Sequence, residues 1–261
     1  MSNLQFGDVV ARLDGLVARI EIHRPPHNYF DPPLIKDLAE AFESMDNHHD
    51  CRAIVLASEG RSFCAGANFN ADVPRSDDVV ADSTSQLYQN AVRLFACRKP
   101  IVAAIQGAAI GGGFGLALVA DFRVVTPDAR FSANFVKLGI HPGFGLTYTL
   151  PRLIGIQRAS LMFYTGRRIT GQQAIEWGLA DIMSSPEGLR DEATKLASEI
   201  AEGAPLAVQS TRATLRSGLV EAIRVQTEHE HHEQGLLFQT EDHAEGVLAV
   251  RERRAGKFKG R

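Results

Sequence analysis

Cysteine is scarce in this chain of 261 residues, and its pattern argues against two classes of protein. The three cysteines, Cys51, Cys64 and Cys97, are an odd number and show no metal-ligand spacing. A secreted domain held together by disulfides and a zinc-binding module are therefore both disfavoured. We expect reduced thiols in a cytoplasmic protein.

A strong charge bias is also lacking, and so are long apolar runs. The formal net charge is −3, from 28 basic and 31 acidic side chains, so we predict no nucleic-acid partner. No uninterrupted apolar run is long enough to cross a bilayer. The first residues, MSNLQFGDVVARLDG, lack the basic-then-apolar pattern of a secretory signal. We therefore predict no membrane partner.

The composition that is present, 44% hydrophobic and 23% charged, is that of an ordinary globular protein. Val-, Leu- and Ile-rich runs flank Asp14-Gly15, which predicts a β-hairpin over residues 8–23. Apolar residues at helical spacing predict a helix over 32–49, and a second helix is expected over 83–99. Between them lie a buried strand, 51–58, and a polar surface loop, 73–80. A strand pair or a kinked strand, broken at Gly107, is predicted over 100–112, and further short strands are predicted at 122–126 and 129–133.

Helical patterns dominate the C-terminal part of the chain. Thr170 and Gln173 have the spacing of a capping box, which predicts the start of a helix that Gly178 ends. From about Pro186 onward we predict helices only, at 187–202, 205–217, 219–239 and 241–254. The fold class is therefore α/β, with strands confined to the N-terminal two thirds.

A glycine cluster, Gly111 to Gly113, comes directly before an apolar helix at 114–119. Glycines at such a turn allow the backbone to approach a ligand, and the unpaired N–H groups suit a phosphate or a developing oxyanion. The dinucleotide-binding fingerprint does not fit, because Leu116 stands where its last glycine should be. A tight structural turn is the alternative interpretation of the cluster.

Six segments together resemble the crotonase superfamily, also called the enoyl-CoA hydratase/isomerase family. They span nearly the whole chain: IEIHRPPHN, SFCAGANF, IQGAAIGGGFGLALVADFRV, LGIHPGFGLTYTLPRLIG, TGRRITGQQAIEWGLAD and EDHAEGVLAVRERRAGKFKG. The resemblance implies a crotonase-like spiral of β-β-α units over residues 1–195. It also implies a helical C-terminal trimerisation region over 196–261, which contacts coenzyme A. The expected assembly is a homotrimer or a hexamer built as a dimer of trimers.

The same resemblance implies an acyl-CoA thioester substrate and no separate cofactor, because coenzyme A is part of the substrate. The thioester oxygen would accept hydrogen bonds from the N–H groups of Ala67 and Gly112, which stabilise an enolate or similar oxyanion. The implied substrate contacts lie in the entry strand, the first loop, the strand after the glycine turn and the basic tail. They are Arg24, Ala65, Asn68, Phe135, Arg253, Lys257 and Phe258.

The chain departs from the family at the positions that carry protons. The two glutamates of the family's hydratases fall at Gly115 and Phe135, and an aspartate used by some members falls at Gly143. We therefore predict a reaction other than standard hydration. His141 is the best replacement, because an imidazole titrates near neutral pH. The alternative is a histidine whose ring only bonds a nearby backbone group.

Several functions stay open at this point. Hydrolysis, decarboxylation, retro-Claisen cleavage or a hydratase/isomerase reaction with a non-glutamate acid or base would each suit an acyl-CoA enzyme. A non-catalytic acyl-CoA-binding homologue and an oligomeric scaffold are the alternatives. Cys64 is expected to be an inert buried thiol, and Asp121 to pair with Arg123. The stretch HEHHEQ, 229–234, favours a solvated or interface helix face over a metal site, so no metal is predicted.

Overall fold

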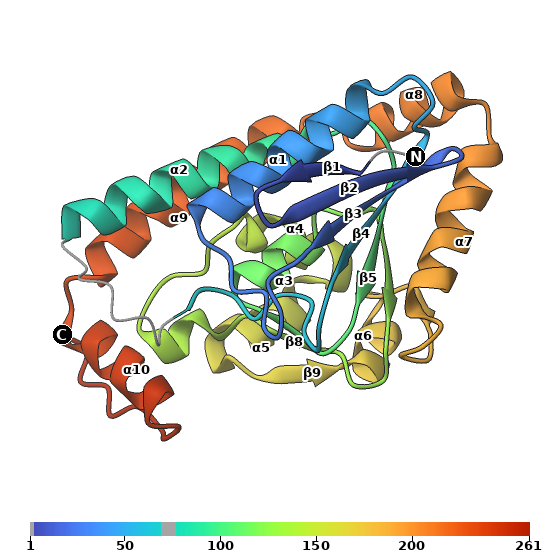
Figure 1. Cartoon of the computed structure of the whole chain (residues 1–261). Helices are drawn as coiled ribbons and strands as arrows, with labels where there is room; N and C mark the ends of the chain where they lie inside the picture. The colour runs from blue at the N-terminus through green and yellow to red at the C-terminus, as the bar shows by residue number, and fades with distance from the viewer. Residues whose placement is uncertain (1–2, 69–76) are drawn as a thin grey trace.

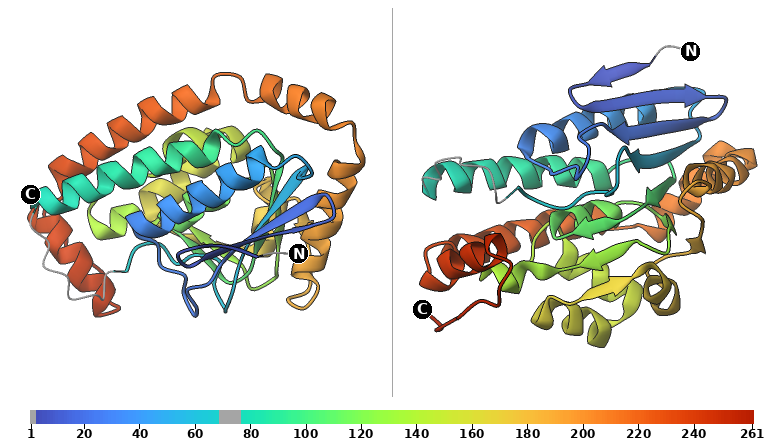
Figure 2. Two further views of the ribbon diagram at one scale, coloured as in Figure 1. Left: turned by 45° about the horizontal axis from the view of Figure 1, so that its top comes forward. Right: turned by 60° about the horizontal axis from the view of Figure 1, so that its bottom comes forward.

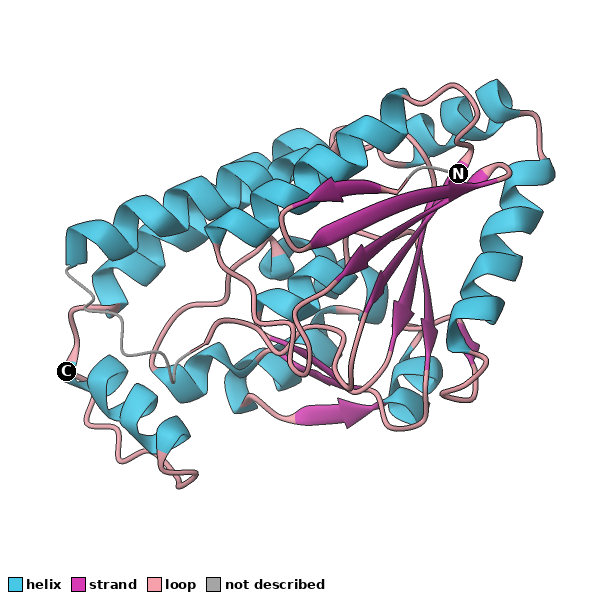
Figure 3. Cartoon of the chain, viewed as in Figure 1, coloured by secondary structure: helices cyan, strands magenta, loops and turns pink. Residues whose placement is uncertain are grey.

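Figure 1 shows a computed structural model of the chain, which describes residues 3–68 and 77–261. The strands form a seven-stranded sheet in the order β1-β2-β3-β4-β5-β7-β10 and a three-stranded sheet in the order β6-β8-β9 (Figure 3). The larger sheet contains β1 (Leu4–Phe6), β2 (Val9–Asp14), β3 (Val17–Ile22), β4 (Ala53–Ser58), β5 (Ile101–Ile105), β7 (Phe122–Val125) and β10 (Ile182–Met183). The smaller one contains β6 (Ala108–Ile110), β8 (Arg130–Ser132) and β9 (Arg168–Thr170). The mixed α/β architecture predicted from the sequence is confirmed.

The larger sheet changes direction at β3. Strands β1, β2 and β3 pair antiparallel, whereas β3, β4, β5, β7 and β10 pair parallel. The predicted hairpin is confirmed, with Asp14 paired to Val17, so that Gly15 and Leu16 make the turn. Gly15 has a φ of +58°, which a glycine adopts without strain.

Both faces of the parallel strands are covered, which explains their continuous apolar sequences. All six residues of β4 are buried. Val55 and Ala57 face α7 (Leu189–Glu202), whereas Ile54 and Leu56 belong to the main core with the apolar face of α1 (Pro32–Asn47). Successive side chains of a strand point to opposite faces, so one short run serves two cores.

Three long helices lie side by side over the main core. The left view of Figure 2 shows α2 (Asp77–Phe95) between α1 and α9 (Leu219–Leu237). Helix α10 (Glu241–Arg251) packs on the short 3₁₀ helix η1 (Asn134–Leu138). The other helices are α3 (Gly112–Ala117), α4 (Leu146–Ile154), α5 (Ile156–Thr165), α6 (Gly171–Trp177) and α8 (Pro205–Leu215). No helix within residues 3–68 and 77–261 has both the length and the apolar character needed to cross a membrane.

Most of the predicted helices are confirmed. The four C-terminal ones correspond to α7, α8, α9 and α10, and Thr170 and Gln173 form the predicted capping box. The loop predicted at 73–80 is wrong from Asp77 onward, because α2 begins there; 69–76 lie outside the described residues. The short strands β9 and β10 were not predicted. The predicted division at 195/196 falls within α7 and stays a prediction.

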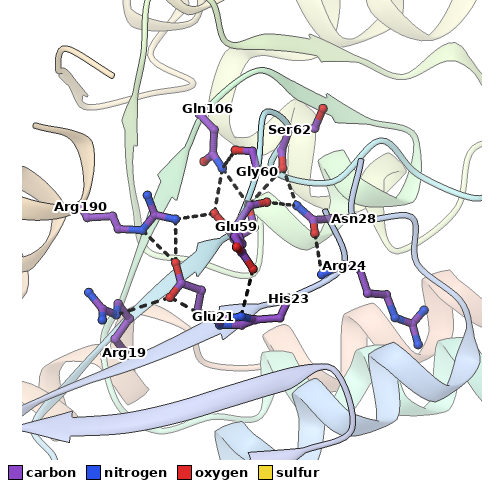
Figure 4. Close-up of polar contacts among 11 residues, drawn as sticks. Arg19, Glu21, His23, Arg24, Asn28, Glu59, Gly60, Ser62, Gln106 and Arg190 are labelled. Atoms are coloured by element: carbon purple, nitrogen blue, oxygen red, sulfur yellow. Dashed lines mark hydrogen bonds and ion pairs between the residues drawn. The ribbon is translucent and has the colours of Figure 1, made fainter. Parts of the chain in front are cut away.

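A buried asparagine links the entry loop, residues 23–31 between β3 and α1, to the segment after β4 (Figure 4). Asn28 lies in the left-handed region with φ +50°, which asparagine tolerates better than most residues. Its side-chain nitrogen donates to the carbonyl oxygens of Glu59 and Ser62, both at 2.7 Å. Its side-chain oxygen accepts from the N–H of Arg24 at 3.0 Å. Asn28 therefore fixes the start of the loop that Ser62 opens.

The predicted pairing of Asp121 with Arg123 is wrong. The Asp121 carboxylate accepts from Arg212 at 2.9 Å and from Arg216 at 2.8 Å, which join α8 and the residue after it to the end of α3. The buried Arg123 guanidinium donates mainly to backbone carbonyl oxygens, and its nearest carboxylate is that of Asp181, at 3.7 Å. Asp121 therefore has a structural role, as expected, but with different partners.

Candidate active site

A cavity of 1920 Å³ opens at the carboxyl ends of β3 and β4. Its wall is formed by the entry loop, the loop 62–68, the glycine turn, η1 and parts of α2, α9 and α10. Seven of the residues that are predicted to be catalytic or to contact the substrate line this cavity. They are Arg24, Ala65, Ala67, Asn68, Gly112, Phe135 and Arg253.

The loop 62–68 and the glycine turn are joined by backbone contacts. The Cys64 N–H donates to the Ala108 carbonyl at 2.9 Å, and the Ile110 N–H donates to the Cys64 carbonyl at 3.0 Å. A methyl group on Gly113 would lie 2.2 Å from the Cys64 oxygen, and one on Gly66 would lie 2.7 Å from the Ile110 oxygen. Both positions therefore require glycine, and the two segments build one wall of the cavity.

The N–H groups of Ala67 and Gly112 are among those of this wall that have no acceptor within the described chain. The Gly111 N–H donates to the Ser132 carbonyl oxygen at 2.8 Å. The N–H groups of Phe114 and Gly115 both donate to the Gly111 carbonyl oxygen. The N–H of Gly112, which lies between Gly111 and Phe114 in the chain, donates to no acceptor in the described residues. The same holds for the Ala67 N–H within residues 3–68 and 77–261. The two residues that the sequence singled out thus present unpaired donors beside the same cavity.

Of the three positions at which the resemblance implies an acid, packing closes two to any side chain. A first side-chain carbon on Gly115 would lie 2.6 Å from Cβ of the buried Phe144. One on Gly143 would lie 1.9 Å from the Tyr88 hydroxyl oxygen. Phe135 lines the cavity with an apolar ring. The absence of acids in the sequence is therefore matched by the absence of room for them at two of the three positions.

Phe144 is held beside Gly115 by a buried carboxylate. Phe144 has a φ of +64°, unusual for a bulky residue, and follows Gly143 in a tight turn. Glu230 of α9 accepts from the N–H groups of Gly145 at 2.7 Å and Thr147 at 3.1 Å, and from the Thr147 hydroxyl at 2.5 Å. Burial raises the pKa of Glu230 to about 7. Glu230 thus stabilises the backbone that places Phe144.

His141 does not face the cavity. Its Nδ1 lies 2.8 Å from the Pro142 carbonyl oxygen, and its ring contacts that of His229 with the centroids 5.9 Å apart. It is not among the residues that form the cavity wall. This is the geometry of the structural alternative, a ring bonded to a nearby backbone group. The catalytic role of His141 stays a prediction that its position does not favour.

The remaining candidates are two residues of the tail, the Cys64 thiol and a metal site. Lys257 and Phe258 are not part of the cavity wall, and the Lys257 N–H donates to Glu245 at 2.7 Å as the tail folds back on α10. Complete burial raises the pKa of the Cys64 thiol to about 12, so a thiolate nucleophile is excluded near neutral pH. Within the described residues, no group of three His, Cys, Asp or Glu side chains is arranged to hold a metal ion.

Among the cavity residues that the sequence does not predict, three lie close together. Tyr88 of α2 and Gln234 of α9 are buried in the wall, and His231 of α9 lies beside Tyr88 with the ring centroids 6.1 Å apart. His231 comes from the HEHHEQ stretch that the sequence assigned to a solvated or interface face. Because α2 and α9 meet only in the folded chain, no local signal predicts this cluster.

Comparison with known proteins shows the family to which the chain belongs. A family model described as enoyl-CoA hydratase/isomerase matches residues 13–261. The chain is 34% identical to (E)-benzylidenesuccinyl-CoA hydratase of Thauera aromatica, over 97% of this chain and 99% of the relative. It is 31% identical to crotonyl-CoA hydratase of Syntrophomonas wolfei, over 98% and 99%. A crystal structure of enoyl-CoA hydratase from Bacillus halodurans superposes with a TM-score of 0.85 at 26% identity, covering 93% of this chain and 100% of that one.

Proposed function

Because the chain belongs to the enoyl-CoA hydratase/isomerase family, we propose that it binds an acyl-coenzyme A thioester and stabilises negative charge on the thioester oxygen. The N–H groups of Ala67 and Gly112 donate to that oxygen. The observation that carries the proposal is that both N–H groups belong to the cavity wall and have no acceptor in the described chain. Gly112 is buried and Ala67 partly buried, and a donor without a partner in such a place is costly, so a ligand oxygen is the natural acceptor.

The chemical benefit of this pair follows from where charge develops. When a proton leaves the carbon next to a thioester carbonyl, or a nucleophile adds to that carbonyl, an electron pair moves onto the oxygen. Donors already fixed around the oxygen stabilise this charge without reorganising, and one such donor lowers the barrier by about 3 kcal/mol. The backbone contacts through Gly66 and Gly113 keep both donors in place.

The proposed reaction is not the glutamate-based hydration of the family's hydratases. Support comes from the packing at Gly115 and Gly143 and from the apolar ring of Phe135, which leave no carboxylate at those positions. An acid or base of another kind would have to move the protons. The imidazole of His231, which lines the cavity and whose pKa burial lowers, is one such group.

The coenzyme A moiety carries phosphates, and basic side chains line the cavity to receive them. Arg253 is the proposed phosphate contact among the predicted tail residues. Arg24 also lines the cavity, but its guanidinium is shared by Asp31, at 2.8 Å, and Asp8, which offset its charge. It is therefore the weaker candidate.

Infrared spectroscopy tests the two donors without knowledge of the reaction. We expect butyryl-CoA labelled with ¹³C at the thioester carbonyl to show a lower C=O stretching frequency when bound, because hydrogen bonds polarise that bond. Ala67→Pro removes one N–H without breaking a recorded hydrogen bond, and most of the shift should disappear. Ala67→Ser, which keeps the N–H, should retain it. Bound thioester with an unshifted carbonyl in the unmodified protein would refute the proposed role.

Turnover separates an enzyme from a non-catalytic binder of the same fold. We expect crotonyl-CoA to bind but to be hydrated far more slowly than by a hydratase with both glutamates. A panel of saturated, unsaturated and 3-oxo thioesters would identify the reaction, and binding without turnover of any of them would favour the non-catalytic homologue. His141→Ala in the same panel tests the predicted role of that imidazole, whose removal should leave turnover unchanged.

A homotrimer, or a hexamer of two trimers, is proposed for the assembly. Large apolar side chains of α5 and α8 are exposed in the single chain: Ile156 by 68%, Leu206 by 80% and Leu215 by 82%. Exposed apolar side chains of this size indicate surfaces that another subunit covers. Sedimentation equilibrium measures the assembly directly, and a monomer at micromolar concentration would contradict the proposal.

A further inference from the structure

Tyr88 and Gln234 form a hydrogen-bonded pair in the cavity wall, contributed by α2 and α9. The Tyr88 hydroxyl donates to the Gln234 side-chain oxygen at 2.8 Å, and the Gln234 side-chain nitrogen donates to the His141 carbonyl oxygen at 2.8 Å. Both side chains are more than nine-tenths buried and both line the cavity. Neither has a part in the oxyanion site described above.

The direction of these hydrogen bonds is fixed by chemistry. The His141 carbonyl oxygen can only accept, so the amide nitrogen of Gln234 must face it and the amide oxygen must face Tyr88. The Tyr88 proton is therefore committed to Gln234. The phenol oxygen keeps accepting capacity, part of which the nearby Phe144 N–H uses, and the second amide proton of Gln234 keeps donating capacity. The pair offers an incoming group one acceptor and one donor.

The pair occupies the place of a missing acid. A first side-chain carbon on Gly143 would lie 1.9 Å from the Tyr88 oxygen and 2.7 Å from the Gln234 nitrogen. The polar atoms of the pair thus lie where a carboxylate at residue 143 would begin. Because burial raises the pKa of Tyr88, its phenol stays neutral and serves as a hydrogen-bonding group without becoming a base.

A continuous apolar wall connects the pair to the oxyanion site. The Phe30 ring touches Gly112, since a side-chain carbon there would lie 2.2 Å from its edge. The rings of Phe30 and Phe144 lie with their centroids 6.1 Å apart, and Phe144 directly follows Gly143. All of these residues line the one cavity. An acyl chain that starts at Gly112 meets hydrocarbon first and the Tyr88–Gln234 pair beyond it.

We propose that Tyr88 and Gln234 bind a hydroxyl group on the acyl chain, so that the site selects hydroxyacyl over plain alkyl thioesters. This inference rests on the proposed function, because it takes the thioester end to lie between Ala67 and Gly112. A hydroxyl both donates and accepts, which matches what the pair offers. A plain alkyl chain would leave the remaining acceptor of Tyr88 and the remaining donor of Gln234 unused, and hydrogen-bonding capacity that is buried without a partner is costly.

Calorimetric binding of two thioesters tests the proposal. We expect 3-hydroxybutyryl-CoA, in at least one enantiomer, to bind about tenfold more tightly than butyryl-CoA. Tyr88→Phe should bring this ratio close to one, and measurable butyryl-CoA binding together with an unaltered circular-dichroism spectrum would show that the variant is folded. Gln234→Met should reduce the ratio as well. Tyr164→Phe, which removes an exposed hydroxyl outside the cavity, is the matched control and should keep the ratio.

Two results would overturn the inference, and they are distinct. Equal binding of both thioesters by the unmodified protein, or an unchanged ratio in Tyr88→Phe, would show that the pair does not contact the acyl chain. If neither thioester binds the unmodified protein, that result would instead refute the proposed function, and this inference with it.

Discussion

The Phe144 side chain fills the space beside Gly115, with its Cβ 2.6 Å from where a first side-chain carbon of residue 115 would lie. The two residues belong to the turn after η1 and to α3, and the contact is made within the main core. A catalytic carboxylate at residue 115 and a phenylalanine at residue 144 are therefore mutually exclusive in this backbone.

Restoring the glutamate should destabilise the protein. We expect Gly115→Glu to lower the free energy of unfolding by about 1–3 kcal/mol, because overpacking forces the core apart. Adding Phe144→Ala should cost less in the Gly115→Glu background than in the unmodified protein. Urea unfolding of the four proteins of this cycle measures the coupling. Strictly additive changes would contradict the contact.

Asn28 should contribute more to the free energy of unfolding than its place in a loop suggests. Asn28→Ala removes the buried amide that donates to the carbonyl oxygens of Glu59 and Ser62, so we expect a loss of about 2–3 kcal/mol of unfolding free energy. Asn90→Ala, which removes an amide from the surface of α2, should cost much less. Similar losses in the two variants, measured by urea unfolding, would show that Asn28 is not a clamp.

The buried Glu230 should make stability fall as the pH rises. Its folded pKa of about 7 lies above the unfolded value of 4.5, so the native state holds the proton between these values while the unfolded state releases it. Stability from this group is complete below pH 4.5 and is lost as the pH rises through 7, by about 3 kcal/mol at most. Glu230→Gln should remove this component of the dependence, whereas Glu228→Gln on the same helix should not. Parallel pH profiles for unmodified protein and Glu230→Gln would exclude the effect.

The thiol of Cys64 should be unreactive despite its place beside the oxyanion loop. With a pKa of about 12, almost none of it is thiolate at pH 7.5, and it is fully buried. Iodoacetamide should leave Cys64 unmodified in the native protein and alkylate it after unfolding in urea, as mass spectrometry of the peptides would show. Rapid native alkylation would mean that the loop opens.

Features encoded by neighbouring residues could be predicted from the sequence. The hairpin at Gly15, the capping box at Thr170 and the four C-terminal helices depend on local turn chemistry and periodicity. Strands β9 and β10, of three and two residues, depend on pairing with distant strands, so no local run announces them. The early start of α2 at Asp77 was missed because acidic and proline residues there were taken for a loop.

The same distinction between local and long-range features applies to the candidate site. Ala67 and Gly112 were found through two motifs whose order along the chain carries the family resemblance. Tyr88 and Gln234 lie 146 residues apart, and only the packing of α2 against α9 brings them together. The sequence pattern favours His141, whereas His231 is the histidine that lines the cavity wall. Side-chain direction decides this, and the sequence does not encode it locally.

Since both proposed oxyanion donors are main-chain groups next to the close contacts at Gly66 and Gly113, the side chain of residue 67 would take no part in donation. Ala67 is only partly buried and lines the cavity. Substitutions that change the size and polarity of this side chain can therefore alter substrate preference and still keep the backbone N–H that is proposed to donate. Binding and charge stabilisation are in this sense separately adjustable in one short loop.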